Sequence, residues 1–219
     1  MSAPTRVLIV DDDALVRSGL SMMLGEFDDI DVAAAVDDGT QVVAAVHRHR
    51  PDVVLMDIRM PKLDGLAATE ALRAIKDPPE VIVLTTFDTD EHIRRALRAG
   101  ASGFLLKHTP PAQIARAIRM VASGEPMLSP EVMRRVMTYV ADSDVDPRRN
   151  RAQVLLERLS DGERDVAVLV GEGKTNSEIA ADLLMSTATV KAYVSRILTK
   201  LDLNNRVQIA LLVHDARKT

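Results

Sequence analysis

Short apolar runs such as Val7–Val10 and Val81–Leu84 alternate with longer stretches in which apolar residues recur at helical spacing. Wholly apolar runs of this length are typical of strands buried on both faces, so the alternation predicts a parallel sheet covered by helices. We expect a doubly wound (βα)5 unit with strand order 2-1-3-4-5. The expected strands lie near 6–10, 31–36, 52–57, 80–85 and 102–107, and the expected helices near 14–25, 39–49, 64–76, 90–99 and 111–123.

The pattern changes after residue 125. Ser129-Pro130-Glu131 is a helix start, and apolar residues continue at helical spacing through Val140. The segment 142–150 is polar and charged and contains a proline, as expected of a linker between domains.

From about residue 154 the pattern is helical throughout. Helix starts are expected at Ser160–Glu163, at Thr175–Glu178, at Ser186 and near 204–205, and the first two fit the capping-box pattern. The chain therefore divides into an α/β domain over 1–125, a helix and interdomain linker over 126–153, and an all-α domain of four helices over 154–219.

Composition narrows the class of protein. With 219 residues, 47% of them hydrophobic, the chain can bury the cores of two domains. The absence of cysteine excludes disulfides and thiolate metal sites and suits a reducing cytoplasm. The chain shows no signal peptide and no stretch of membrane-spanning length, so a soluble cytoplasmic protein is expected. A net charge of −4 argues against a generally basic coat for nucleic acid, although the C-terminal segment is more basic than the first domain.

Polar residues follow the apolar runs where the runs end. Asp11 and Asp12 follow the first run, Asp57 the third, Thr85 ends the fourth, and Lys107 follows the fifth. The carboxyl ends of parallel strands gather along one edge of a sheet, so these side chains should share a crevice. Carboxylates in one crevice require a cation unless one is protonated, and Mg²⁺ prefers oxygen ligands. Asp57 could then attack a phosphoryl donor, while Lys107 and Thr85 stabilise the phosphoryl oxygens.

These residues, in this order, resemble the receiver domain of two-component response regulators over nearly all of 1–125. The resemblance implies three groups of site residues: the phosphoacceptor Asp57; the Mg²⁺ ligands Asp11, Asp12, Asp57 and the backbone carbonyl of Arg59; and the phosphate-binding and switch residues Thr85, Phe104 and Lys107. It also implies that the side chains of Arg59 and Phe87 tune the lifetime of the phosphoryl group.

The segments Gly173–Ala180 and Ser186–Leu201 resemble the scaffold and recognition helices of the helix-turn-helix domain of the NarL/FixJ (LuxR-type) regulators. The resemblance implies that the second helix enters the major groove of DNA. Candidate DNA contacts are Thr187, Thr189, Lys191, Ala192 and Ser195, and candidate phosphate contacts are Lys191, Arg196, Lys200 and Arg206. Two residues depart from the family pattern: Gly162 is expected to loosen the first helix, and Tyr193 either contacts the DNA backbone or packs.

The two resemblances together predict a phosphorylation-controlled transcription regulator. A sensor histidine kinase would phosphorylate Asp57, Thr85 would move toward the phosphate, and Phe104 would turn inward, which would control homodimerisation and binding to promoter DNA. Beyond self-phosphorylation and slow self-dephosphorylation, no enzyme activity is expected. Two alternatives remain: a receiver with a protein- or RNA-binding output domain, and a phosphatase of the haloacid dehalogenase type. The phosphatase would need a second Asp where Arg59 stands.

Overall fold

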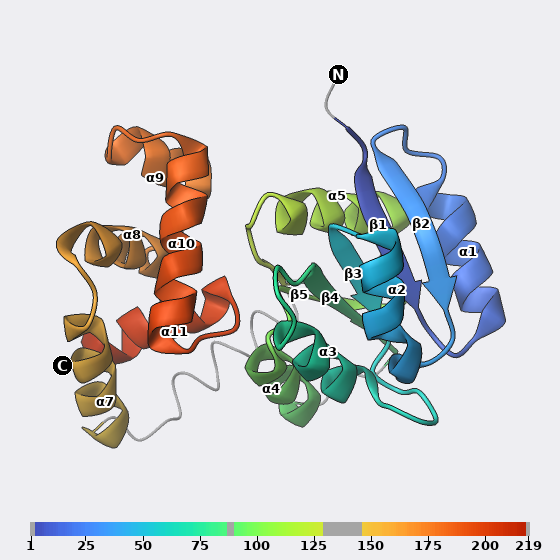
Figure 1. Cartoon of the computed structure of the whole chain (residues 1–219), viewed down its shortest axis with the longest axis horizontal. Helices are drawn as coiled ribbons and strands as arrows, with labels where there is room; N and C mark the ends of the chain where they lie inside the picture. Colours follow the sequence, from blue (N-terminus) through green and yellow to red (C-terminus); the bar gives the residue numbers. More distant parts are fainter. Residues whose placement is uncertain (1–2, 87–89, 129–145, 218–219) are drawn as a thin grey trace. The chain divides into compact units, whose positions relative to one another are not determined.

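The computed structural model describes residues 3–86, 90–128 and 146–217 (Figure 1). The chain forms two compact units, residues 1–136 and 137–219. The helix expected over 129–140 and the expected role of Phe87 fall outside the described residues. Within the described ranges, no helix is both long and apolar enough to cross a membrane.

The first unit is built on a parallel sheet. Its strands are β1 (Thr5–Val10), β2 (Ile30–Val36), β3 (Val53–Met56), β4 (Glu80–Thr85), β5 (Gly103–Leu106) and β6 (Met127–Leu128), in the order β2-β1-β3-β4-β5-β6. The five expected strands and their order are confirmed. The structure adds an edge strand, β6, whose two residues pair in parallel with Gly103 and Phe104. A strand of two residues is too short to show an alternating hydrophobic pattern in the sequence.

Two layers of helices cover the sheet (Figure 1). They are α1 (Ala14–Leu24), α2 (Val42–His49), α3 (Gly65–Arg73), α4 (Asp90–Ala99) and α5 (Pro111–Ala122), with a 3₁₀ turn, η1, over Gly39–Gln41. Successive residues of β1 point to opposite faces: Val7 and Ile9 join the core beneath α1 and α5, whereas Leu8 and Val10 join the core beneath α2 and α3. Burial on both faces explains why the strand is apolar at every position.

Aspartates begin three of these elements. Asp13 accepts from Leu15 N at 2.8 Å to cap α1, and Asp64 accepts from Ala67 N at 2.8 Å to cap α3. Asp38 lies in a loop but is only 1% exposed, because its carboxylate turns back onto Thr40 at the start of η1. The sequence does not distinguish this buried cap from the exposed acids around it.

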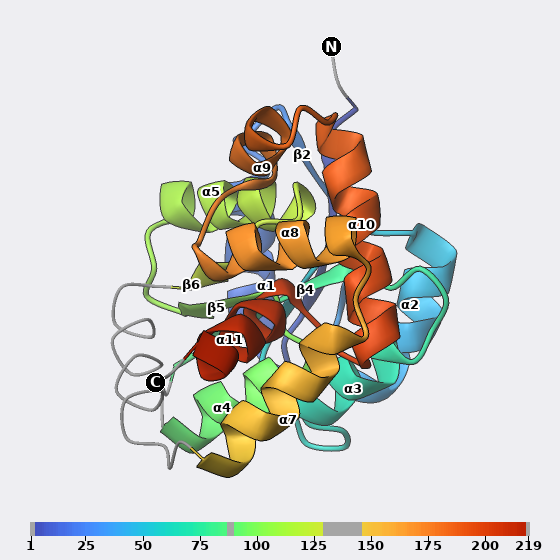
Figure 2. The ribbon, with the colours of Figure 1, turned by 90° about the vertical axis from the view of Figure 1, so that its left-hand side faces the viewer.

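The second unit is wholly helical. Its helices are α7 (Asp146–Glu157), α8 (Asp161–Gly171), α9 (Asn176–Asp182), α10 (Thr187–Leu201) and α11 (Arg206–Arg217). Figure 2 shows α8 and α11 against α10, with α7 beside α11. The four expected helices are present, and both capping boxes form, at Ser160 and at Thr175. The core includes Val166, Ile179, Val190, Ile197 and Ile209.

Helix α7 occupies part of the expected linker. Residues 146–150 begin this helix, so the linker expected over 142–150 is wrong in its second half. A proline in the first turn of a helix is tolerated because its missing N–H has no partner there in any case. Further along α7, Ala152 is buried, and Leu155 and Leu156 pack against the core of the second unit. Apolar packing of the C-terminal half thus holds a helix whose N-terminal half is polar.

Candidate functional site

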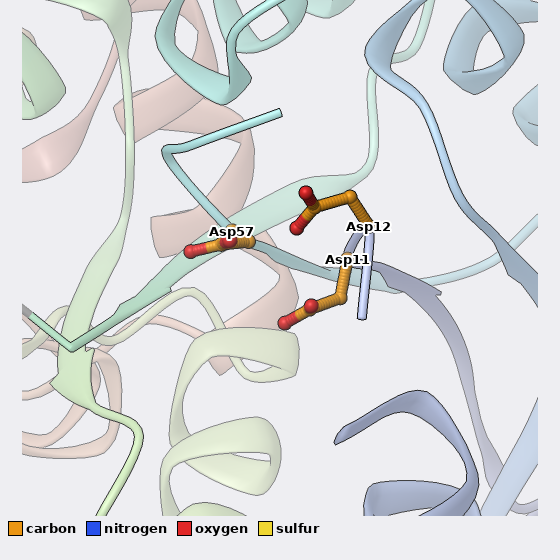
Figure 3. A group of neighbouring side chains, drawn as sticks. All are labelled: Asp11, Asp12 and Asp57. Atoms are coloured by element: carbon orange, nitrogen blue, oxygen red, sulfur yellow. The ribbon is translucent and has the colours of Figure 1, made fainter. Parts of the chain in front are cut away.

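Three carboxylates meet at the carboxyl ends of β1 and β3 (Figure 3). Asp11 and Asp12 follow β1 and Asp57 follows β3, and the two strands are tied by the N–H of Asp57, which donates to the Val10 carbonyl at 2.8 Å. One oxygen from each carboxylate lies within 4.8 Å of the other two. Asp11 and Asp57 are 2% and 5% exposed, whereas Asp12 is exposed. The structure therefore brings together the acids that the sequence singled out.

Lys107, which follows β5, joins the cluster. Its Nζ lies 2.6 Å from Asp11 Oδ2 and 3.1 Å from Asp57 Oδ2. Burial raises the pKa of Asp57, against the opposing effects of Lys107 and of the Ile58 N–H. Burial alone would lower the pKa of Lys107, but its hydrogen bonds and attraction to Asp11 and Asp57 outweigh burial and raise it. Lys107 is thus held as a cation against two carboxylates.

The cluster fits a divalent metal ion. Three carboxylates and one ammonium leave two net negative charges when all are ionised, which a divalent cation would balance. The donor set is wholly oxygen, as Mg²⁺ prefers, and the exposed Asp12 leaves one side open to the waters that Mg²⁺ usually keeps. Asp11, Asp12 and Asp57 could therefore hold a metal.

Thr85 and Phe104 lie on the strands next to this cluster. Thr85 ends β4 and is 2% exposed, and its carbonyl accepts from the N–H of Lys107 at 2.8 Å. Phe104, in β5, is 1% exposed. The ring is already buried, so this structure does not show the outward position from which the expected inward turn of Phe104 would begin.

Two glycines shape the loop that follows Asp57, and sequence reasoning missed both. A Cβ on Gly65 would lie 1.8 Å from the Asp57 carbonyl oxygen, and the Gly65 N–H donates to the Ile58 carbonyl at 2.9 Å. A Cβ on Gly39 would lie 2.3 Å from the Leu63 carbonyl oxygen. The sequence held one signal for Gly65: a glycine stands at the start of this helix, where residues of higher helix propensity are more usual.

The exposed face of α10 carries the residues that the sequence assigned to DNA. Thr187, Thr189, Lys191, Ala192 and Ser195 are all exposed, and Thr189 Oγ1 lies 2.8 Å from Ser186 Oγ at the start of the helix. The opposite face is buried in the core through Val190, Val194, Ile197 and Leu201. The helix thus keeps a polar face clear of the core of its own domain.

Two exposed cations among the expected phosphate contacts, Arg196 and Lys200, have partners within the domain. The Arg196 guanidinium lies 4.3 Å from the centre of the Tyr193 ring. Lys200 Nζ lies 2.8 Å from Glu163 Oε2, and Lys200, together with the Ser160 N–H, lowers the pKa of Glu163 to about 2. Both cations remain exposed. Contact with a phosphate is therefore compatible with their positions but competes with these partners.

Tyr193 and Gly162 pack together. A Cβ on Gly162 would lie 3.1 Å from the Tyr193 hydroxyl oxygen, so the glycine makes room for the ring. The packing alternative for Tyr193 therefore has direct support. α8 nevertheless starts at Asp161 with a capping box, so the helix is formed with Gly162 in its first turn.

Arg206 has a different environment from the other cations. It is 8% exposed, and its guanidinium donates to Asn176 Oδ1 and to the Lys174 carbonyl, at the start of α9. This geometry favours a structural role for Arg206 over the expected contact with a DNA phosphate. The side chain instead ties the start of α11 to the start of α9.

The class that this fold and site define is a doubly wound α/β domain with an acidic cluster at its sheet edge, joined to an all-helical domain, and comparison with known proteins agrees. Residues 7–119 match the model of the response regulator receiver domain, and residues 157–213 match that of the bacterial regulatory proteins of the luxR family. The transcriptional regulatory protein LiaR of Bacillus subtilis is 37% identical over 209 residues, covering 95% of this chain and 96% of LiaR. The response regulator protein VraR of Staphylococcus aureus is 36% identical over 208 residues, covering 94% of each.

A solved structure extends the likeness over the whole chain. The response regulator ChrA of a heme-sensing two-component system is 34% identical, with a TM-score of 0.54 and coverage of 99% of both chains. The chain belongs to the two-component response regulators with a luxR-family C-terminal domain. It is a transcription regulator rather than a classical enzyme.

Proposed function

We propose that Asp57 accepts a phosphoryl group from a sensor histidine kinase and that this modification controls DNA binding by the second unit. The observation that carries the proposal is the convergence of Asp11, Asp12 and Asp57 with Lys107 at one edge of the sheet. In the transfer, a carboxylate oxygen of Asp57 forms the new bond to phosphorus as the bond to the donor nitrogen breaks.

The residues around Asp57 have separate parts in this reaction. Mg²⁺ held by Asp11, Asp12, Asp57 and the backbone carbonyl of Arg59 would supply positive charge to the phosphoryl oxygens. Lys107, a cation held 3.1 Å from Asp57, donates to the same oxygens once its bond to the free carboxylate is given up. The Thr85 hydroxyl, at the end of the adjacent strand, donates to the product and couples it to β4 and β5.

The second unit is the proposed output. In this proposal α10 enters the major groove and presents Thr187, Thr189, Lys191, Ala192 and Ser195 to DNA, while Arg196 and Lys200 reach phosphates. A homodimer would place two such helices on half-sites about one helical turn apart. We assign the receiver to 1–125 and the DNA-binding domain to 154–219, with α7 attached to the latter, and we place the protein in the cytoplasm.

A phosphorylation assay tests the first half of the proposal. The purified protein is incubated with Mg²⁺ and a small acyl phosphate, and its intact mass is then measured by mass spectrometry. The wild type and the control Asp28→Asn, which alters an exposed loop acid, should gain one phosphoryl group, and Asp57→Asn should gain none. An equal gain by Asp57→Asn rejects the assignment, and multiple-turnover hydrolysis of phosphoesters would favour an enzyme instead.

A DNA-binding assay tests the second half. Phosphorylation should tighten binding to the promoter of the protein's own gene in a gel shift, and Asp57→Asn should not respond. Lys191→Ala should weaken binding to all sequences alike and reduce the slope of log affinity against log salt by about 1, because one phosphate contact is lost. Binding that is absent in the wild type, phosphorylated or not, would favour a protein or RNA target.

A further inference from the structure

The loop between β3 and α3 bears on the site because it follows Asp57 directly and contains Arg59. The part of the loop nearest Asp57 is held by its own residues. Ile58 and Met60 are buried, and Gly65 packs against the Asp57 carbonyl. Its far part, around Lys62 and Leu63, is contacted by a different segment, the turn between β2 and α2.

Asp38 and Gly39 make this contact. The Leu63 carbonyl lies so close to Gly39 that a Cβ there would be 2.3 Å from the oxygen and 3.1 Å from the carbonyl carbon. Beside it, Lys62 Nζ lies 3.6 Å from Asp38 Oδ2. One residue of the turn therefore accommodates the loop backbone and the next attracts a loop side chain.

The two oxygens of Asp38 have different surroundings. Oδ1 accepts from the backbone N–H and the hydroxyl of Thr40, at 2.7 and 2.5 Å, which completes the cap of η1. Oδ2 is buried and has no hydrogen-bond partner among the described residues, although it faces the Lys62 ammonium. A buried carboxylate oxygen without a hydrogen bond is costly, and capping alone needs one side-chain oxygen, as serine or asparagine would provide. The cap therefore does not account for a carboxylate at this position, whereas attraction between Oδ2 and the Lys62 ammonium does.

We propose that Asp38 and Gly39 are positioning residues for the metal and phosphoryl site, because they hold the Lys62–Leu63 part of the loop that carries the Arg59 carbonyl. This inference rests on the proposed function. Asp38 acts through Lys62, and Gly39 acts through the Leu63 backbone. Neither touches the reacting atoms.

Magnesium affinity, measured by calorimetry on the full unphosphorylated chain, tests the inference without relying on activity. Asp38→Asn keeps an oxygen for Thr40 and removes the charge that faces Lys62. We expect it to raise the Kd for Mg²⁺ by about twofold to fivefold, the order expected for loss of a half-exposed ion pair. Asp37→Asn is the matched control: Asp37 is the exposed neighbour, bonded to Gln41, and its variant should leave the Kd unchanged.

Two further variants separate positioning from capping. Lys62→Met should raise the Kd as Asp38→Asn does, and the double variant should add less than twofold to either, because both remove the same contact. Gly39→Ala keeps the carboxylate but displaces the Leu63 carbonyl, so it should also weaken Mg²⁺ binding. Amide hydrogen exchange within 61–65 should quicken in Asp38→Asn and Gly39→Ala but not in Asp37→Asn.

The outcomes are distinct. A lower melting temperature with an unchanged Kd in Asp38→Asn and Gly39→Ala would show a structural cap alone and overturn the inference. A Kd raised equally by Asp37→Asn would show a general charge effect and overturn it too. If the wild type takes up no phosphoryl group, the proposed function fails; if it does so while the Asp38 and Gly39 variants bind Mg²⁺ normally, only the positioning role fails.

Discussion

Replacing Arg206 with methionine distinguishes a structural arginine from one that contacts DNA. The substitution keeps the length of an apolar stem and removes the guanidinium that bonds Asn176 Oδ1 and the Lys174 carbonyl. Asn176 is 3% exposed, so water replaces the lost donor poorly. Hydrogen bonds to charged groups contribute about 1.5–3 kcal/mol each. Loss of both bonds, partly offset by burial of the apolar methionine side chain, should lower the free energy of unfolding of the second unit by about 3 kcal/mol.

Thermal unfolding of the full chain, followed by circular dichroism, measures this loss. For a domain of this size 1 kcal/mol shifts the midpoint by about 4–8 °C, so a loss of about 3 kcal/mol should lower the transition of the second unit by roughly 12–24 °C. The transition of the receiver should not move. Well below both transitions, Arg206→Met should bind DNA within about twofold of the wild type, with an unchanged salt slope.

Lys191→Met is the matched control, because it removes an exposed cation from the same domain. It should leave both transitions in place and weaken DNA binding. A structural role for Arg206 is refuted if Arg206→Met behaves like Lys191→Met, with normal stability, weaker binding and a salt slope reduced by about 1.

Three other predictions concern the two units separately. Glu163, with its pKa lowered from 4.5 to about 2, stabilises the second unit fully above pH 4.5 and loses that effect as the pH falls toward 2. Glu163→Gln should lower the free energy of unfolding of the second unit, measured with denaturant at pH 7, by only about 1–2 kcal/mol, because Lys200 is partly exposed. The variant should also show a weaker dependence of stability on pH. Gly65→Ala should destabilise the receiver by about 1–3 kcal/mol and slow phosphorylation by an acyl phosphate, since the new methyl meets the Asp57 carbonyl. Lys107→Met should tighten Mg²⁺ binding about threefold or more by calorimetry, because a competing cation is removed, yet abolish the response of DNA binding to phosphorylation.

Much of the receiver could be predicted because its strands are buried on both faces. Val7–Val10 must be apolar throughout, and the first polar residue after them marks the edge of the sheet, where the chemistry gathers. The convergence of Asp11, Asp57 and Lys107 follows from the parallel strand order together with their positions directly after β1, β3 and β5. Capping boxes likewise predicted where α8 and α9 begin.

The remaining features depend on tertiary contacts that leave no local pattern. Asp38 reads like the exposed acid before it, and only the position of Thr40 and Lys62 makes it a buried group. Arg206 reads like any basic residue near a DNA-binding helix until Asn176 is brought to it from 30 positions away in the sequence. Gly162 reads as a weak helix start until Tyr193 is placed against it. In each case the partner lies on an element whose packing the local sequence does not encode.

The short edge strand β6 determines how the chain leaves the receiver. Met127 and Leu128 pair with Gly103 and Phe104, so the last described residues before the second unit are bonded, backbone to backbone, to the strand that bears the buried ring. A shift of β5 along its own axis must therefore break or carry this pairing. Any such shift would therefore act on Met127 and Leu128, the last residues described before the chain continues toward the second unit.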